Sequence, residues 1–294
     1  MRRVGHGQTP GSPGWTLRRV LRRPSAAVGL LVLLAVIACA LAAPWVAPQH
    51  PTRGRIDRRL QPPGIAEAHR INLLGTDPLG RDVLSRIIFG ARVSLIVGIS
   101  AVFGAGVLGT VLGLVSGYAG RITDTVVMRV ADVQLAFPFV LLALAIVAIL
   151  GPGVGNLIIV FVVTGWVVFA RIVRGQVLQI REREFVQASR GLGASDARVV
   201  VRHVLPNVTG PLIVVASFEL AKVIIWEASL SFLGLGVPPT IPSWGAMLSD
   251  GRQYVDTAWW VATFPGVALM VVVLSINAVG DALRDALDPR LQHL

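Results

Sequence analysis

Long apolar segments separated by shorter polar ones dominate the sequence. A helix needs about 20 apolar residues to cross a bilayer, because backbone amides in hydrocarbon must be hydrogen-bonded within the helix. Six segments meet this length, although the fifth also contains Glu219, Lys222 and Glu227. The pattern predicts an all-α membrane protein with six transmembrane helices, over residues 26–46, 93–118, 125–150, 154–173, 208–230 and 258–279.

The first apolar segment has two interpretations. Arginines at positions 18, 19, 22 and 23 precede it and it ends near Ala40-Leu41-Ala42, as in a signal peptide with a small-residue cleavage site. Its 21 residues, however, exceed the roughly 7 to 15 of a secretory apolar region. We therefore expect a retained membrane anchor.

Arginine placement predicts the orientation, because short cytoplasmic loops carry an excess of basic residues. The two tails, the turn after the second helix and the segment after the fourth hold 17 basic residues, against nine on the opposite side. Both termini are therefore expected in the cytoplasm. Trp45, Trp244, Trp259 and Trp260 are expected at the outer interface, which indole rings favour. The predicted organisation is a cytoplasmic tail (1–25), the first helix (26–46), an extracytoplasmic segment (47–92), a core transmembrane domain (93–281) and a second cytoplasmic tail (282–294).

The composition supports a membrane protein and argues against several kinds of site. Hydrophobic residues make up 54% of the chain and charged residues 15%, with a mean hydropathy of +0.70, which does not fit a water-soluble fold. The lone Cys39 and five scattered histidines predict neither a disulfide framework nor a metal site. In a membrane chain the net charge of +11 is first a topological signal, so we expect no nucleic-acid partner.

Glycine and proline positions indicate how the helices pack. Gly109, Gly113 and Gly117 recur every four residues in the second predicted helix, leaving one face with little side-chain bulk. Such a face allows a neighbouring helix to approach closely, although it could also line a pore. Pro138 is expected to kink the third helix, because proline removes a backbone donor and clashes with the preceding turn.

Three charged residues in the fifth predicted helix need partners. Each charge at mid-bilayer costs about 2.5 to 3.5 kcal/mol, so these side chains are not expected to face lipid. Glu219 and Lys222 are three residues apart and can pair on one face, either to neutralise each other or to contact a hydrophilic passage. Glu227 has no cation nearby in the sequence and needs a partner from another helix or water, with a structural or a translocation role.

A polar, arginine-rich segment at residues 175–207 joins the fourth and fifth helices. Gly191 and Gly193 separate two stretches of helical pattern, residues 183–190 and 195–204. Ser195 and Asp196 form an acceptable helix start, and Pro206 is expected to stop the second stretch before the next span. Two short helices suggest a docking element for a soluble partner, although an ordinary surface loop is the alternative.

Enzyme chemistry is not expected from this chain. A phosphate-binding Walker A loop needs Gly-Lys-Ser or Gly-Lys-Thr, and the only lysine, Lys222, lies in a predicted span. No serine-hydrolase elbow, catalytic carboxylate pair or Cys-His arrangement is evident in the sequence. Any ATP chemistry therefore belongs to a partner.

The segment 175–207 resembles the signature loop of permease subunits of binding-protein-dependent ABC importers. Gln187-Ala188-Ser189 stands where that family has Glu-Ala-Ala, Gly193 at its glycine and Leu205-Pro206 at its close. Three further stretches look like the C-type rather than the B-type subunit of the dipeptide, oligopeptide and nickel permease group. They are residues 74–86, 227–236 and 280–289.

This resemblance implies a type I ABC importer permease fold with a cytoplasmic coupling helix, located in the bacterial inner membrane. The implied partners are a B-type permease subunit of the DppB or OppB kind, two ATPase subunits of the DppD or DppF kind, and an extracytoplasmic solute-binding protein. ATP and Mg²⁺ would be bound by the ATPases, with no cofactor in this chain. The implied function is a transport subunit that forms half of a pathway for dipeptides or oligopeptides, with nickel or glutathione as alternative solutes.

Three groups of candidate site residues follow. Contact with the ATPases is expected at Gln187, Ala188, Ser189, Gly193, Ala194, Ser195, Asp196, Arg198, Leu205 and Pro206. The translocation path is expected at Glu219, Lys222, Trp226 and Glu227. Docking of the binding protein is expected at Asp77, Arg81, Asp82, Trp244, Asp250 and Arg252.

A self-sufficient secondary transporter is the rival function from another class. Such a protein would be expected to show repeats, with interrupted helices and midplane ion ligands in both halves. We find no internal repeat in the sequence, which favours the permease interpretation.

Overall fold

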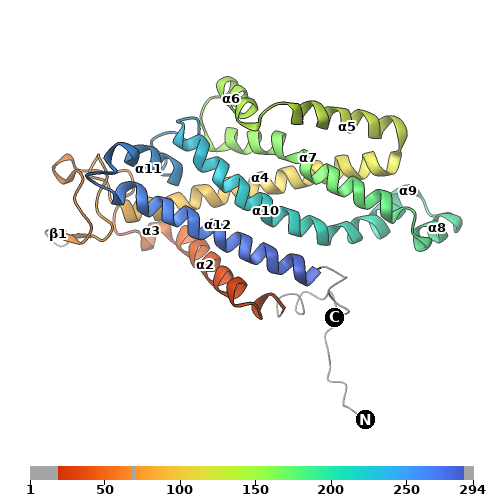
Figure 1. The fold of residues 1–294 in the computed structure, drawn as a ribbon, viewed down its shortest axis with the longest axis horizontal. Coiled ribbons are helices and arrows are strands. Elements are labelled where there is room, and N and C mark those ends of the chain that lie inside the picture. Colours follow the sequence, from red (N-terminus) through yellow and green to blue (C-terminus); the bar gives the residue numbers. More distant parts are fainter. Residues whose placement is uncertain (1–18, 68–69, 288–294) are drawn as a thin grey trace, which may run out of the picture.

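The computed structural model describes residues 19–67 and 70–287 as an elongated helical bundle (Figure 1). The long helices run along the molecule, which has the segment around β1 and α11 at one end and α8 and α9 at the other. The helical elements are α2 (Pro24–Leu41), α3 (Ala43–Val46), η1 (Ile56–Arg58), α4 (Val83–Ala119), α5 (Arg121–Ala136), α6 (Phe139–Leu150), α7 (Val154–Ile180), α8 (Glu184–Gly191), α9 (Asp196–Val199), η2 (Val200–Val204), α10 (Leu205–Phe232), α11 (Trp244–Gly251), η3 (Arg252–Tyr254) and α12 (Trp260–Leu287).

The predicted all-α membrane class is confirmed. Among the described residues, five helices are long and apolar enough to cross a membrane, or six if α5 and α6 form one bent span. A small addition is the antiparallel hairpin of β1 (Ile65–Glu67) and β2 (Arg70–Asn72). Three-residue strands are too short to give an alternating hydrophobic pattern that the sequence would reveal.

The third predicted span is broken rather than kinked. Helices α5 and α6 are bent by 93° at Pro138. Phe137 adopts an extended backbone (φ −89°, ψ 131°), because the proline ring excludes the helical conformation from the residue before it. The bend was expected at this residue, but it separates two helices where the sequence predicted one kinked helix over residues 125–150.

Several helices extend beyond the apolar segments that predicted them. Helix α4 begins ten residues before position 93, so the last part of the segment assigned to the outside is helical. The Asp82 side chain caps this helix by accepting a hydrogen bond from the Ser85 backbone amide at 2.8 Å. Helices α7 and α12 likewise continue seven and eight residues past the predicted ends at 173 and 279. High hydropathy marks only the part of a helix that can contact lipid. Polar turns beyond that part continue the same pattern of backbone hydrogen bonds, so the helix is longer than its apolar segment.

The glycines of α4 form a packing seam against α7, as one of the two interpretations predicted. A Cβ atom on Gly113 would lie 2.6 Å from the carbonyl oxygen of Ala170 and 2.7 Å from the Cβ of Val173. A Cβ on Gly117 would lie 2.8 Å from that of Val177. The two helix backbones approach this closely only because side chains are absent at these positions.

Helix α2 packs along α12 on one side of the bundle (Figure 1). A Cβ on Gly29 would lie 2.9 Å from the carbonyl oxygen of Ser275. Near the start of α2, Arg23 pairs with Asp285 close to the end of α12 at 2.5 Å. The first apolar segment is thus integrated into the bundle, which fits the expected membrane anchor. Residues 1–18 of the N-terminal tail and 288–294 of the C-terminal tail lie outside the described residues.

The seam makes a specific prediction about helix packing. Gly113→Ala should destabilise the protein by about 1 to 3 kcal/mol, because the new methyl group meets backbone that cannot move aside. Gly175→Ala is the matched control, since it lies in α7 and a Cβ there meets no atom within 4 Å. The thermal unfolding midpoint of the purified protein in detergent measures both. Equal midpoints for the two variants would contradict the close approach.

Candidate functional site

Helices α8 and α9 form a projection at one end of the bundle (Figure 1). Val186 of α8 is completely buried and packs in a cluster that includes Val177, Ile180 and Val199. This cluster joins α8 and α9 to the end of α7. The two predicted helical stretches are confirmed, and the apolar contact fixes the projection to the bundle instead of leaving it as a loose loop.

The turn between α8 and α9 depends on Gly193, which has a φ of +84°. Residues other than glycine rarely adopt this left-handed conformation. The Gly193 amide donates to the Arg190 carbonyl at 2.9 Å, and the Ala194 amide donates to the Ser189 carbonyl at 3.1 Å. Leu192 stands at the tip of this turn with 90% of its surface exposed.

Most of the predicted coupling residues share the outer surface of this projection. Ser189 and Ala194 are half-buried at the turn, and Leu205 is half-buried at the start of α10. The Ser189 hydroxyl lies 3.3 Å from the Nε2 atom of His203. The exposed members are Gln187, Ala188, Gly193, Ser195, Asp196, Arg198 and Pro206.

Pro206 does not stop the second stretch, contrary to the prediction. Helix α9, the π-helical turn η2 and α10 follow one another without a break from Asp196 to Phe232. Pro206 is the second residue of α10 and lies directly after η2, where the Leu205 amide donates to the Val200 carbonyl five residues earlier. The π-helical turn before it shifts the hydrogen-bonding register locally. The projection and a membrane span therefore share one helical rod.

Tyr118 at the end of α4 connects that helix to the projection. Its hydroxyl lies 2.7 Å from Oδ1 of Asp196 and accepts a hydrogen bond from Arg190 Nε at 3.2 Å. The guanidinium of Arg190 also lies over the tyrosine ring, 4.8 Å from its centre. The hydrogen bond with Tyr118 raises the pKa of Arg190. The sequence analysis missed this residue, because a tyrosine at the end of a span is equally typical of a lipid interface.

Three further polar contacts tie α4, α5 and α7 together near the same end. Arg174 of α7 donates to Asp124 of α5 at 2.6 Å, and the Ser116 hydroxyl of α4 donates to the same carboxylate at 2.5 Å. Arg181 donates to the Gly117 carbonyl at 3.2 Å. The helices that carry the projection are thus cross-linked to one another around it.

The predicted pairing of Glu219 with Lys222 in α10 is confirmed. The Lys222 Nζ atom lies 2.6 Å from the Glu219 carboxylate. The glutamate side chain is 11% exposed and the lysine side chain 49% exposed. The acid is therefore inside the bundle, whereas the base extends from it.

Glu227 finds its partners on another helix and within α10. Its side chain is completely buried and accepts hydrogen bonds from Ser94 of α4 and Ser231, each at 2.8 Å. The sequence predicted such a partner from another helix. In this conformation, however, the buried Glu227 side chain does not reach an open surface, so it does not line the predicted translocation path. Trp226 lies beside it and packs on Phe139 of α6, with ring centres 4.5 Å apart.

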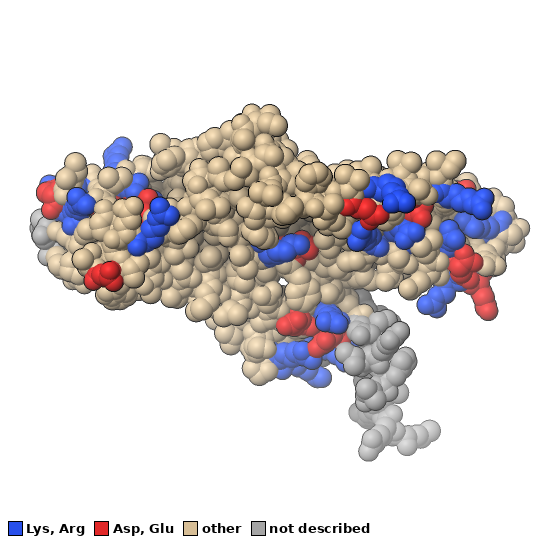
Figure 2. All heavy atoms as spheres, turned by 45° about the horizontal axis from the view of Figure 1, so that its top comes forward, with Lys and Arg blue, Asp and Glu red and all other residues tan. Residues whose placement is uncertain are grey.

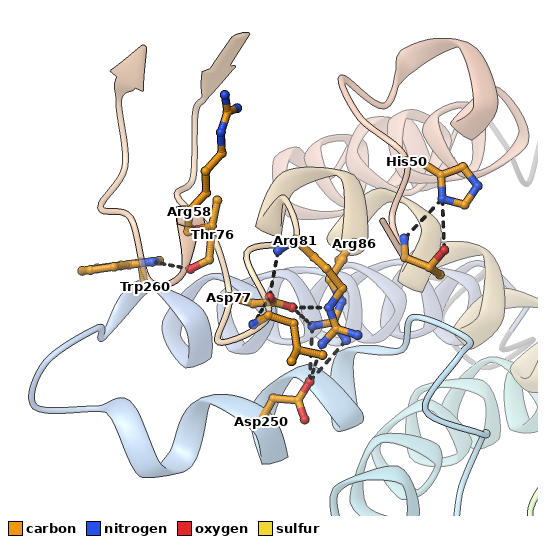
Figure 3. A network of polar contacts seen from close by, with 10 residues as sticks. His50, Arg58, Thr76, Asp77, Arg81, Arg86, Asp250 and Trp260 are labelled. Carbon is orange, nitrogen blue, oxygen red and sulfur yellow. Dashed lines mark hydrogen bonds and ion pairs between the residues drawn. The ribbon is translucent and has the colours of Figure 1, made fainter. Parts of the chain in front are cut away.

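A buried charge network lies at the opposite end of the molecule (Figure 3). Asp77 is completely buried and accepts hydrogen bonds from the side chains of Arg86 and of Arg81, the latter at 2.6 Å. Asp250 of α11 lies 3.2 Å from Arg81 and 3.3 Å from Arg86. The two acids and two bases balance, and they join the turn before α4 to α11.

Four of the six residues expected to dock a binding protein are instead interior. Asp77, Asp82 and Trp244 are buried and Arg81 is only 9% exposed, so these four offer at most the edge of a contact surface in this conformation. Burial raises the pKa of the Asp82 carboxyl, opposed by the hydrogen bonds from Ser85. Asp250 and Arg252 do reach the surface, beside an open cleft of about 350 Å³.

Two tryptophans expected at the lipid interface have a different role. The Trp244 indole donates to the Ile87 carbonyl at 3.0 Å, and the Trp260 indole donates to the Thr76 carbonyl at 3.1 Å. Both are buried because they fasten α11 and α12 to the outer segment. Trp45 and Trp259 are exposed, as an interfacial position requires.

No cluster of three or more His, Cys, Asp or Glu side chains suited to a metal ion occurs within residues 19–67 and 70–287. Several polar groups of this part of the chain form ion pairs and hydrogen bonds between helices. The arrangement can therefore connect helices and transmit movement along them.

The sequence matches two families of membrane transport components. Residues 109–293 match the model of the binding-protein-dependent transport system inner membrane component. Residues 15–63 match the N-terminal TM domain of oligopeptide transport permease C. The chain belongs to the binding-protein-dependent transport system inner membrane component family. It is therefore a permease subunit of an ABC transport system, and the predicted family resemblance is confirmed.

Relatives and a solved structure agree with this assignment. The permease is 46% identical over 266 residues to the di/tripeptide transport system permease protein DppC of Pseudomonas aeruginosa, covering 90% of this chain and 88% of the relative. It is 42% identical over 286 residues to the glutathione transport system permease protein GsiD of Pectobacterium atrosepticum, covering 97% and 93%. An inward-facing structure of the MetNI methionine ABC transporter has the same fold, with a TM-score of 0.57, 22% identity, and coverage of 69% of this chain and 96% of that one.

The outer charge network predicts a large stability effect in the permease. Asp77→Ala should destabilise the protein by about 3 to 5 kcal/mol, because it leaves the buried Arg86 without its principal partner. Asp57→Ala is the control, since Asp57 pairs with Arg55 on the exposed surface and should contribute little. Thermal unfolding in detergent measures both. An Asp77→Ala protein as stable as the control would show that the network does not hold α11 in place.

Glu227 allows its hydrogen bonds to be separated from its charge. Glu227→Gln should keep both serine contacts, whereas Glu227→Ala should cost about 1 to 3 kcal/mol by leaving the Ser94 and Ser231 hydroxyls unpaired. Thermal unfolding and transport by the assembled system measure the two variants. If both variants lost the same stability and transport activity, the hydrogen bonds to Ser94 and Ser231 would not be the reason that Glu227 is needed.

Proposed function

We propose that this permease subunit belongs to an ATP-driven importer of short peptides and transmits movement of cytoplasmic ATPases to the membrane. The observation that carries the proposal is the unbroken helix from Asp196 to Phe232, because it makes the exposed projection and a membrane span one mechanical element. An exposed leucine at the tip, Leu192, supplies an apolar contact for a soluble protein.

The proposed assembly supplies what this chain lacks. Two ATPase subunits bind ATP and Mg²⁺ and contact α8 and α9. A B-type permease subunit provides the other half of the pathway. An extracytoplasmic solute-binding protein delivers the solute at the opposite end, where Asp250 and Arg252 reach the surface. The arginine-rich projection suits an acidic groove, which would also position it electrostatically.

Movement would pass through the permease as displacement of nearly rigid helices. A shift of α9 moves α10 directly, and Tyr118 passes it to α4 through Asp196 and Arg190. Ion pairs between α5 and α7 keep these helices together during the shift. The exchange of access requires that nucleotide-bound and nucleotide-free ATPases favour different arrangements of the permease.

The proposed orientation places α8 and α9 in the cytoplasm of a bacterial cell. The start of α2 and the end of α12 are the ends of these two helices that lie nearer to the projection (Figure 1). The contact of Arg23 with Asp285 joins these two ends. With the projection inside, both chain ends are cytoplasmic, and the outer hairpin and α11 face the binding protein. The excess of arginine at this end supports the same orientation.

Short peptides are the proposed solute class, because relatives named for peptide transport match nearly the full chain. Glutathione, itself a tripeptide-like solute, is the alternative favoured by the Pectobacterium relative. ATP-dependent uptake of peptides by the reconstituted complex tests the proposal. Uptake by this chain alone, without ATPases, would instead indicate a secondary transporter.

The coupling role makes a prediction at Gly193. Gly193→Val should leave membrane insertion intact but lower peptide uptake per ATP hydrolysed by roughly tenfold, because strain of about 1 to 2 kcal/mol in the turn changes the projection. Gly191→Ala is the control, since Gly191 ends the helix α8 and a Cβ there meets no atom within 4 Å. An unchanged ratio of uptake to hydrolysis in Gly193→Val would count against the coupling role.

A further inference from the structure

The ammonium group of Lys222 has an unusual position for a membrane protein. Ten residues separate Lys222 from the end of α10 at Phe232, which is about 15 Å along the helix and half of a hydrocarbon core of about 30 Å. The lysine side chain is nevertheless 49% exposed. Figure 2 shows charged groups gathered toward both ends of the molecule, with a blue and red pair within the broad uncharged region between them.

An exposed ammonium at this depth excludes lipid as its neighbour in the assembled protein. A lysine at the centre of a span is rare and faces the protein interior or a water-filled cavity, and it is too far from either interface to extend its head group into water. Pairing with Glu219 reduces the cost but does not cover the exposed half of the side chain. The face of α10 around Lys222 therefore borders protein or water.

The other residues on this face suit a passage more than a tightly packed interface. Ile225 and Ser229 follow Lys222 at spacings of three and seven residues and so lie on the same side of α10. Ile225 is exposed, and the Ser229 hydroxyl donates to the Ile225 carbonyl at 2.8 Å, which leaves its oxygen free to accept. Trp226 borders the face and is held against Phe139.

The acid and the base differ in accessibility, which determines the kind of ligand that fits. Both oxygens of Glu219 lie 2.6 Å from Nζ, but the carboxylate is mostly inside the bundle. An ammonium has three donor hydrogens, so Lys222 can bind a second acceptor from the open side without losing Glu219. A small anion is thus accommodated, whereas a cation would have to reach the buried acid.

We propose that Lys222 is a transient binding point for the carboxylate of the solute as it crosses the membrane, with Glu219 as the residue that holds the ammonium in place. The ligand class is a small solute with a free carboxylate, such as the C-terminus of a short peptide. This inference rests on the proposed peptide import. Because Glu219 keeps the empty site neutral and competes for the ammonium, binding is weak enough for the solute to leave, as conduction requires.

The first experiment compares peptides with and without a carboxylate in the complete reconstituted importer. Lys222→Gln should lower the maximal uptake of a free dipeptide by roughly tenfold, the effect of losing a charge-assisted hydrogen bond, and leave its C-amidated analogue unaffected. Each rate is compared with wild type for the same peptide, which removes differences in delivery by the binding protein. Equal loss for both peptides would overturn the proposal.

A charge exchange separates recognition from simple neutralisation. The double variant Glu219→Lys with Lys222→Glu keeps an ion pair between the same two positions but presents the acid on the open side. Solute recognition predicts that uptake of the free dipeptide stays low in this variant. Recovery to the wild-type rate would mean that Glu219 and Lys222 serve only to neutralise each other, and would overturn the proposal.

A labelling experiment tests whether the face is open to water. Ile225→Cys, in a Cys39→Ser background, keeps the ion pair and should react with a membrane-impermeant methanethiosulfonate reagent, more slowly when free dipeptide is being transported. Leu34→Cys, exposed on the peripheral helix α2, is the lipid-facing control and should not react. An unreactive Ile225→Cys would place this face against an acidic surface of the second permease subunit and overturn the proposal.

Failure of this inference is distinguishable from failure of the proposed function. A wild-type complex that takes up dipeptide with ATP, and variants that behave like wild type, would reject only the role of Lys222. A wild-type complex with no ATP-dependent peptide uptake would reject both.

Discussion

A charged group inside hydrocarbon must have a partner, and this constraint accounts for the arrangement of the polar residues in the permease. Glu219 lies against Lys222, and the buried Glu227 accepts hydrogen bonds from serines on two helices. Most of the remaining charges gather toward the two ends of the molecule, with a further group at its lower edge in Figure 2. Each polar contact between helices also limits how those helices can move relative to each other. The side chains that pair to avoid an unpartnered charge in the membrane therefore also define which helices move together.

The projection of α8 and α9 illustrates how contacts between helices limit their relative movement. Pro206 follows the π-helical turn η2, where the hydrogen-bond register changes, and α9, η2 and α10 form one rod. The contacts of Tyr118 add α4 to that rod. The glycine seam then brings α7 so close to α4 that these two helices move as a pair. These contacts connect the projection to most of the bundle.

Paired charges also organise the end of the molecule around α11. There most of the paired residues are buried, whereas the surface of the projection is exposed. Arg81 and Arg86 pair with the buried Asp77 and also attract Asp250 from α11. Two tryptophan indoles donate hydrogen bonds to backbone carbonyls nearby. Most residues that the sequence suggested as a docking surface are instead buried in the contacts that join the turn before α4 to α11. The surface left for a partner consists of the rim around Asp250 and Arg252.

Local chemistry in the sequence was sufficient for several features. Apolar length determined the spans, four-residue glycine spacing determined the seam, and a three-residue spacing determined the pair of Glu219 and Lys222, because each depends on residues within a few helical turns. The family pattern around Gly193 likewise marked the projection, whose turn needs a left-handed residue.

Other features depended on residues far apart in the chain and were decided only by the tertiary structure. Pro138 marked a bend from the sequence alone, but the 93° angle between α5 and α6 is seen only in the folded chain. Arg86 and Asp250 are 164 residues apart, so no local pattern shows that the network around Asp77 is buried. The hydrogen bonds of Tyr118 and the open side of Lys222 are of the same kind. A sequence records which groups need partners, whereas only the packing of helices decides which partners they meet and which surfaces remain open.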